Sequence, residues 1–236
     1  MIAAVSMPVL ELVTSSSLGS LLGMRHALEP DHLAAVSTLV SEERSSVKAA
    51  WLGACWGLGH TFALVIVGAV LIVLRAELPA RVADLFELFV AFMLIGLGLR
   101  AIAQSARQGQ NGPLRSHHHH GVVHSHQSGA AHIHIGTWTL ARRPLLVGAV
   151  HGLAGSGALT ALVLATLPSA GAQLAYMGLF GLGSTLGMAA LSGLLGWPLA
   201  RLGAHRGVAR AISLTVGCTS TVLGLAWGYP LLSKIW

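Results

Sequence analysis

The fold of this chain is set by Arg25-His26-Ala27-Leu28-Glu29-Pro30-Asp31-His32, eight residues inside a long apolar region that covers about residues 7–40. Ionisable side chains are expensive at membrane depth, so they usually mark a function there. Five of these eight residues are ionisable. Pro30 has no N–H to donate to the carbonyl four residues earlier, and the helix is therefore predicted to kink or break at this point. A break would let the two histidines and the aspartate converge, whereas an unbroken helix would spread them over different faces.

Imidazole and carboxylate groups together suit a divalent transition metal such as Ni²⁺, Co²⁺ or Zn²⁺ better than soft Cu⁺. Two more histidines, at positions 60 and 151, stand alone in apolar segments. Each could instead make a simple interhelical hydrogen bond. The predicted metal-binding residues are His26, Asp31, His32, His60 and His151.

The composition is that of an integral membrane protein. Only 9% of the 236 residues are charged and 54% are hydrophobic, whereas a soluble domain carries about a quarter charged residues. A membrane-spanning helix needs about 20 apolar residues. We therefore predict an all-α polytopic membrane protein of about six transmembrane helices, with lipid and not nucleic acid as its environment. The expected segments are about 7–40, 49–74, 82–103, 145–167, 172–198 and 211–232.

A polar, histidine-rich stretch divides the chain in the middle. The expected organisation is a first transmembrane half at 1–104, a loop at 105–143 and a second transmembrane half at 144–236. Four consecutive histidines would suggest an affinity tag, but this run is internal and further histidines follow it. Such tracts are typical of loose metal binding. The accessory metal-binding residues are predicted to be His117, His118, His119, His120, His124, His126, His132 and His134.

Basic residues are distributed unequally between the two sides of the predicted membrane segments. One side carries Arg44, Lys48, Arg100, Arg107, Arg115, Arg142, Arg143, Arg201, Arg206 and Arg210. The other side carries only Arg75, Arg81 and Lys234. Cytoplasmic loops hold the excess of Lys and Arg. The chain is therefore expected to be a multi-pass protein of the inner (plasma) membrane, with its histidine-rich loop in the cytoplasm and both termini outside.

The sequence also contains a weak internal repeat. The segment at 23–28 parallels 148–153 at an offset of 125, and the segment at 57–62 parallels 181–186 at an offset of 124. Each half would hold three spans, so the second half would enter the membrane from the opposite side. Two inverted three-helix repeats around a broken helix are a common plan of secondary transporters.

The run from His26 to His32 has the spacing HX4DH and resembles the signature of the nickel/cobalt transporters (NiCoT/NicO family), in particular its UreH-like branch. The stretches at 56–61, 143–148 and 150–156 strengthen the resemblance, which covers nearly the whole chain. It implies a nickel or cobalt permease in which His26, Asp31 and His32 bind the ion. Many members have Asp where this chain has Glu29. An ion pair between Arg25 and Glu29 is also expected.

The function expected is transport of nickel or cobalt, most simply uptake, without a resident cofactor or an enzymatic activity. The resemblance implies a metallochaperone or urease maturation proteins as cytoplasmic partners. Efflux, with the histidine-rich loop sampling cytoplasmic metal, is the first alternative. A membrane-bound metal sensor that binds without transport is a second. An acyltransferase is a remote third, because His26 and Asp31 also fit an HX4D dyad in which aspartate orients a histidine base.

Overall fold

The computed structural model describes residues 17–41, 43, 45–108, 117–119, 122–124, 132–135, 138–167, 169–202 and 206–235. A first helix covers residues 17–26 of this described part. The helices that follow are α2 (Pro30–Val40), α3 (Ser46–Leu74), α4 (Ala80–Gln108), α5 (Arg142–Thr166), α6 (Ala170–Leu202) and α7 (Arg206–Ile235).

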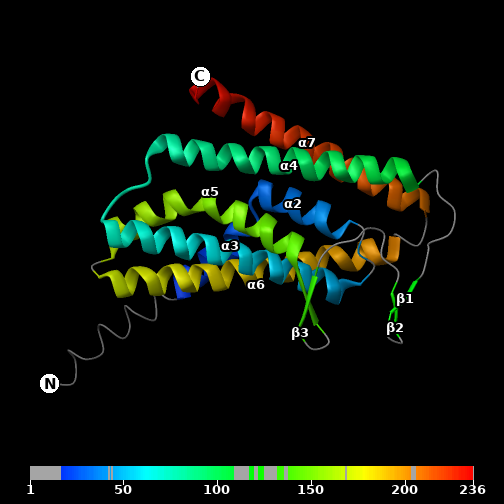
Figure 1. The fold of residues 1–236 in the computed structure, drawn as a ribbon, viewed down its shortest axis with the longest axis horizontal. Helices are drawn as coiled ribbons and strands as arrows, with labels where there is room; N and C mark the ends of the chain where they lie inside the picture. The colour runs from blue at the N-terminus through cyan, green and yellow to red at the C-terminus, as the bar shows by residue number, and fades with distance from the viewer. Residues whose placement is uncertain are drawn as a thin grey trace.

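The long helices pack in two groups (Figure 1). Helix α3 packs against α5 and α6, and α4 packs along α7. The short helix α2 lies between the two groups and contacts α4, α6 and α7. The segment with the HX4DH spacing is therefore held at the junction of the two groups, with protein on several sides.

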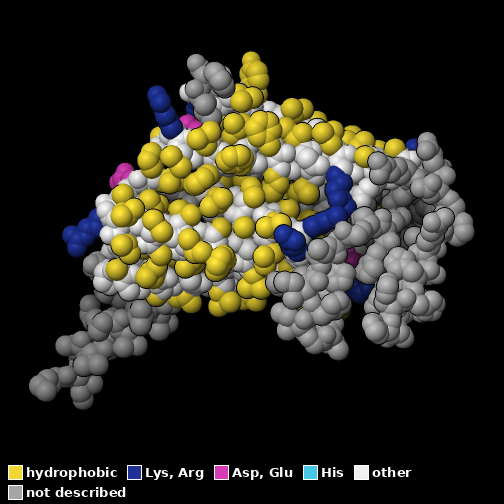
Figure 2. All heavy atoms as spheres, in the orientation of Figure 1, with side chains coloured by type: hydrophobic (Ala, Val, Ile, Leu, Met, Phe, Trp, Pro, Cys, Tyr) yellow, Lys and Arg dark blue, Asp and Glu magenta, His cyan; other side chains and the backbone are white. Residues whose placement is uncertain are grey.

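Among the described residues, four helices are long and apolar enough to cross a membrane, namely Ser46–Leu74, Ala80–Ala106, Ala170–Pro198 and Gly207–Lys234. The other two predicted spans correspond to α5 and to the broken first segment, so the count of six remains a prediction. On the face of the molecule drawn in Figure 2, hydrophobic side chains cover most of the coloured surface and only a few charged side chains are visible. The chain is a polytopic helical membrane protein.

The predicted break in the first segment is confirmed. The first helix is helical up to residue 26, residues 27–29 form a turn, and α2 begins at Pro30. Proline is favoured at the first position of a helix, where its missing N–H has no partner to lose. The carbonyl of His26 is not left free, because it accepts a hydrogen bond from the Glu29 N–H at 3.0 Å. The chain thus changes direction within one short turn.

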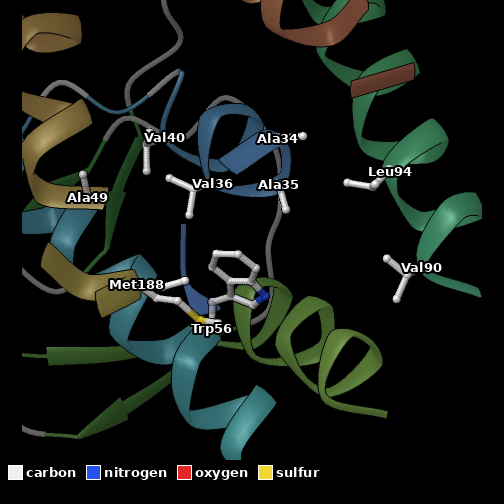
Figure 3. Packing of buried hydrophobic residues seen from close by; sticks show 10 residues of the cluster. Ala34, Ala35, Val36, Val40, Ala49, Trp56, Val90, Leu94 and Met188 are labelled. Atoms are coloured by element: carbon white, nitrogen blue, oxygen red, sulfur yellow. The ribbon is translucent and has the colours of Figure 1, made fainter. Parts of the chain in front are cut away.

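Helix α2 is fixed by a core of small and branched side chains around Trp56 of α3 (Figure 3). Val36 of α2 and Met188 of α6 lie near the indole ring, while Ala34 faces Leu94 of α4. Trp56, Val36 and Leu94 are completely buried. Because small residues allow close helix approach in membranes, this packing places the start of α2 against α3.

The described part of the central loop forms two short antiparallel hairpins. Strand β1 (His117–His119) pairs with β2 (Val122–His124), and β3 (His132–Ile135) pairs with β4 (Trp138–Ala141). The all-α prediction thus describes the membrane-embedded part, to which the hairpins are an addition. The division of the chain at 104 and 143 stays a prediction, while the helices on either side end at Gln108 and begin at Arg142.

Candidate metal centre

Four histidines and one aspartate that are far apart in the sequence converge at the break. His26 ends the first helix, Asp31 and His32 begin α2, His60 lies on α3, and His151 lies on α5. The ring centroid of His32 is 4.4 Å from that of His26 and 4.5 Å from that of His151. His60 lies 5.3 Å from His26 and 5.4 Å from His32. All five predicted residues therefore belong to one cluster.

The cluster is deeply buried and lies at the middle of the helices. His32, His60 and His151 are 1%, 0% and 2% exposed. His60 lies 14 residues from either end of α3, which runs from residue 46 to residue 74. At 1.5 Å per residue this is about 21 Å on each side, so the cluster lies at the middle of a helix long enough to span a bilayer. Imidazoles at this depth have no bulk water to solvate them and must find partners within the protein.

Asp31 bridges two of the histidines. Its Oδ1 lies 3.0 Å from Nδ1 of His32, and its Oδ2 lies 3.1 Å from Nε2 of His151. A carboxylate can only accept, so both ring nitrogens donate to it. Each donated N–H fixes the tautomer of its ring and leaves the opposite nitrogen with a lone pair. The carboxylate thereby orients both imidazoles in the way that outer-shell groups orient metal-binding histidines.

Glu29 orients the ring of His26 in the same way, and this corrects the expected ion pair between Arg25 and Glu29. The ion-pair partner that the structure gives Glu29 is Nδ1 of His26, at 3.0 Å, and not the guanidinium of Arg25. The Glu29 side chain is about half exposed, whereas His26 is largely covered. Because Asp31 contacts His32 and His151, it does not form the His26–Asp31 dyad that an HX4D acyltransferase would need.

The ring nitrogens opposite these carboxylates have no hydrogen-bond partner among the described residues. They are Nε2 of His26, Nε2 of His32 and Nδ1 of His151, together with both nitrogens of His60. A buried polar atom without a partner costs free energy. Within the set His26, His32 and His60, and within the set Asp31, His32 and His151, the possible ligand atoms lie within 4.8 Å of one another. A bound cation would supply a partner for the lone pairs among these nitrogens, of which neutral His60 has one.

Two aromatic side chains line the cluster, and reasoning from the sequence did not single them out. The ring of Trp56 lies 5.4 Å from His32 and 5.5 Å from His151, and the ring of Phe180 lies 5.4 Å from His26. Trp56 and Phe180 stand at the repeat offset of 124, which is the pattern that could have identified them. Their rings exclude water from the imidazoles.

The accessory histidines belong to the central loop of the sequence. The backbones of His117–His119, His124, His132 and His134 form parts of the hairpins. His120 and His126 fall outside the described residues. Their predicted role in metal binding stays a prediction.

A close helix contact holds His60 in place and leads to a first prediction. A Cβ on Gly152 of α5 would overlap the carbonyl of His60. In Gly152→Ala, α3 and α5 must therefore separate, which costs about 1–3 kcal/mol of stability and displaces His60. We expect nickel flux in proteoliposomes to fall several-fold. Gly178→Ala is the matched control, because a Cβ there meets nothing within 4 Å. Equal flux in the two variants would contradict the packing argument.

Comparison with known proteins adds an independent finding. The model of the NicO family, described as "High-affinity nickel-transport protein", matches residues 12–229. The chain is 31% identical over 235 residues to "Urease accessory protein UreH" of Bacillus sp. (strain TB-90), covering 98% of this chain and 99% of that protein. It is also 35% identical over 96 residues to the Arabidopsis thaliana "Chloroplast protein FOR GROWTH AND FERTILITY 1", covering 40% of this chain but 26% of that protein. No solved structure matches the chain.

Proposed function

Because the chain belongs to the NicO family of nickel-transport proteins, we propose that its buried histidine cluster is the site through which Ni²⁺ or Co²⁺ crosses the membrane. The observation that carries this proposal is the convergence of unpartnered ring nitrogens at the middle of a helix long enough to span a bilayer. Neutral imidazole is a good ligand for both ions. The two carboxylates add negative charge that offsets the charge of the cation.

The proposal names the ligands. His26, His32, His60 and His151 supply nitrogen, and Asp31 supplies oxygen or orients its two histidine neighbours. Glu29 holds His26 from the exposed side. A purely structural cluster would be expected to pair its histidines with one another, whereas here each ring keeps at least one nitrogen without a partner among the described residues. The same observation argues against an acyltransferase, which would have no use for four imidazoles.

The decisive experiment is to measure the flux of radioactive Ni²⁺ and Co²⁺ into proteoliposomes that contain the purified full chain. Flux above that of empty liposomes, saturable and competed by the other ion, is the expected result. Tight binding without flux would instead support the metal-sensing alternative. The absence of both binding and flux would reject the proposed function.

We propose that transport runs inward, with the histidine-rich loop in the cytoplasm and both termini outside. A membrane potential of 100 mV, negative inside, favours influx of a divalent cation by about 4.6 kcal/mol. Uptake therefore needs no coupling ion. A proton-driven exporter would need relay carboxylates in its spans. Beyond Glu29 and Asp31, the only acidic residues in the apolar segments are Glu11, Asp84 and Glu87, which lie at or near their ends.

The direction of transport gives a second prediction. Cells that lack this protein are expected to contain less nickel than their parent, as measured by elemental analysis at a limiting external concentration. Complementation with the intact gene should restore the level, and an Asp31→Ala copy should not. A higher nickel content in the deletion strain would mean efflux and would reverse the assigned direction.

The similarity to a urease accessory protein points to the partners. We propose that nickel that reaches the cytoplasm is passed through the histidine-rich loop to a metallochaperone or to urease maturation proteins. Clustered imidazoles bind metal loosely and release it quickly, which suits a transfer step. The loop follows α4 directly and precedes α5, the helix that carries His151, so it begins and ends at the cytoplasmic face under this orientation.

The loop provides a third prediction. Deletion of residues 117–134 should leave flux at saturating nickel nearly unchanged, because the membrane cluster is intact. At limiting nickel, delivery to a cytoplasmic acceptor should fall several-fold. The control replaces the same residues by a Gly/Ser linker of equal length. Complete loss of flux in the deletion, with the protein correctly inserted, would show that the loop belongs to the transport path itself.

A further inference from the structure

We propose that the cluster contains two alternating ion positions that share His32, one formed with His26 and His60 and the other with Asp31 and His151, and that the ion passes from one to the other as it crosses the midplane. This deepens the proposed function and rests on it. The inference comes from reciprocal contacts between the two halves of the chain, which place His26 of the first set and His151 of the second set on opposite sides of an axis.

The first reciprocal contacts are between backbones. Gly23 lies against the carbonyl of Phe180, and Gly148 lies against the carbonyl of Trp56. Gly148 is Gly23 plus 125, and Phe180 is Trp56 plus 124. Each contact therefore becomes the other when both of its residues are replaced by their counterparts in the other half of the chain. A two-fold axis produces this pattern, because residue i contacts residue j and the counterpart of j contacts the counterpart of i.

A second pair of contacts repeats the pattern elsewhere. Gly59 lies against the carbonyl of Leu145, and Gly183 lies against the carbonyl of Ser20. The offsets are again 124 and 125. These contacts join the same two pairs of helices as the first ones, α3 with α5 and α6 with the first helix. The same axis therefore accounts for them.

Two contacts locate the axis, because a residue that touches its own counterpart must lie on it. Thr61 and Thr185 share a hydrogen bond of 3.0 Å between their hydroxyls, at a separation of 124. Ser220, one residue beyond the counterpart of Leu94 at the offset of 125, donates to the carbonyl of Leu94 at 2.9 Å, so the axis also passes close to this contact. Thr61 and Leu94 both lie near the middle of their helices. The axis therefore crosses the long helices near their centres, parallel to the membrane plane.

Such an axis exchanges the two sides of the membrane. His26 and His151 are counterparts at an offset of 125, and each lies against the counterpart aromatic ring, His26 against Phe180 at 5.4 Å and His151 against Trp56 at 5.5 Å. The two histidines are therefore related by the axis, so where one lies toward one side of the midplane, the other lies toward the opposite side.

His32 lies between them. Its ring centroid is 4.4 Å from that of His26 and 4.5 Å from that of His151, although its own counterpart position in the second half is a glycine, Gly157. A neutral imidazole offers one lone pair. His32 can therefore complete the set with His26 and His60 or the set with Asp31 and His151, but not both at once. The cluster therefore holds one ion at a time, in either of the two positions.

The experiment measures tight Ni²⁺ binding and Ni²⁺ flux on the same purified full-length variants. Binding is titrated against a chelator of known affinity, so that loose sites on the histidine-rich loop are not counted. His26→Ala and His151→Ala are each expected to keep one tight ion, with Kd raised no more than about tenfold, while flux falls to background. His32→Ala and the double variant His26→Ala/His151→Ala are expected to lose tight binding.

Several outcomes would overturn the proposal. If His26→Ala and His151→Ala each lose tight binding as completely as His32→Ala, one site uses all the ligands. If either single variant retains more than about a tenth of the flux, transfer between two positions is not required. His151→Gln, which preserves volume, replaces His151→Ala if the latter does not fold, as judged by size-exclusion chromatography. If the wild type binds Ni²⁺ but shows no flux, the proposed function fails, while the binding pattern still tests the two positions.

Discussion

Asp31→Ala is expected to lower Ni²⁺ flux at least about 100-fold and to weaken tight Ni²⁺ binding by roughly 10–100-fold. The reason is that one carboxylate orients two imidazoles, with Asp31 Oδ1 3.0 Å from His32 and Oδ2 3.1 Å from His151. Without it, both rings are free to rotate and to change tautomer, and the lone pair of His32 no longer points to the other ligands. The flux is measured in proteoliposomes, and binding is measured on the same preparation.

Asp31→Asn separates charge and geometry. The amide has nearly the same shape, but its oxygen can accept only on one side and its NH₂ group donates on the other. The asparagine can therefore hold one of the two histidines in its present tautomer, but it forces the other histidine to change its tautomer. A loss of flux nearly as large as in Asp31→Ala is expected. Full flux in Asp31→Asn would show that the double acceptor is not needed.

Asp84→Ala is the matched control for both variants. Asp84 lies near the start of α4 and faces Lys234 at 3.9 Å, in a pair whose lysine is largely exposed. Surface pairs of this kind contribute about 0–1 kcal/mol to stability. Asp84→Ala removes the same carboxylate without disturbing the cluster, so its flux should match that of the wild type.

The sequence was sufficient to predict the break and the residues that gather around it. Pro30 alone removes the hydrogen-bond donor on which a continuous helix depends. Histidines in apolar segments need polar partners within the protein, so they are expected to gather. The apolar windows also predicted the helices closely. Helix α4 extends from Ala80 to Gln108, beyond the expected 82–103, because hydropathy marks the part of a helix that contacts lipid and not the point where the helix ends.

The pairing inside the cluster could not be predicted in this way. Arg25 and Glu29 are a natural ion pair by spacing, yet Glu29 contacts His26, which the turn at residues 27–29 brings within 3.0 Å. Asp31 reaches His151 on α5, and the sequence alone does not say which helices meet. The roles of Trp56 and Phe180 follow from the same helix packing. Side-chain partners across helices depend on how the helices cross, which no local pattern records.

The second half of the chain provides a comparison for Pro30, if the predicted repeat holds. The repeat offset of 125 places Gly155 at the position of Pro30, and α5 runs without interruption from Arg142 to Thr166 through that residue. The first half has proline there and is broken. The two segments therefore adopt different conformations, and the presence or absence of an N–H at this position is one of the sequence differences between them.

Pro30→Ala is accordingly expected to lower Ni²⁺ flux about tenfold or more, with normal insertion. Proline in a helix interior is about 3 kcal/mol less favourable than alanine, so the substitution favours the continuous helix by roughly that amount, at the expense of the turn that joins His26 to His32. Pro30→Gly should give an intermediate flux, because glycine disfavours the helix by only about 1 kcal/mol.

Flux and tight binding are measured on the wild type, Pro30→Ala and Pro30→Gly. Pro230→Ala, which removes the proline inside α7, is the control and should retain flux. If Pro30→Ala transports as well as the wild type, the break at residues 27–29 is held by tertiary packing alone, and proline is not what brings the ligands together.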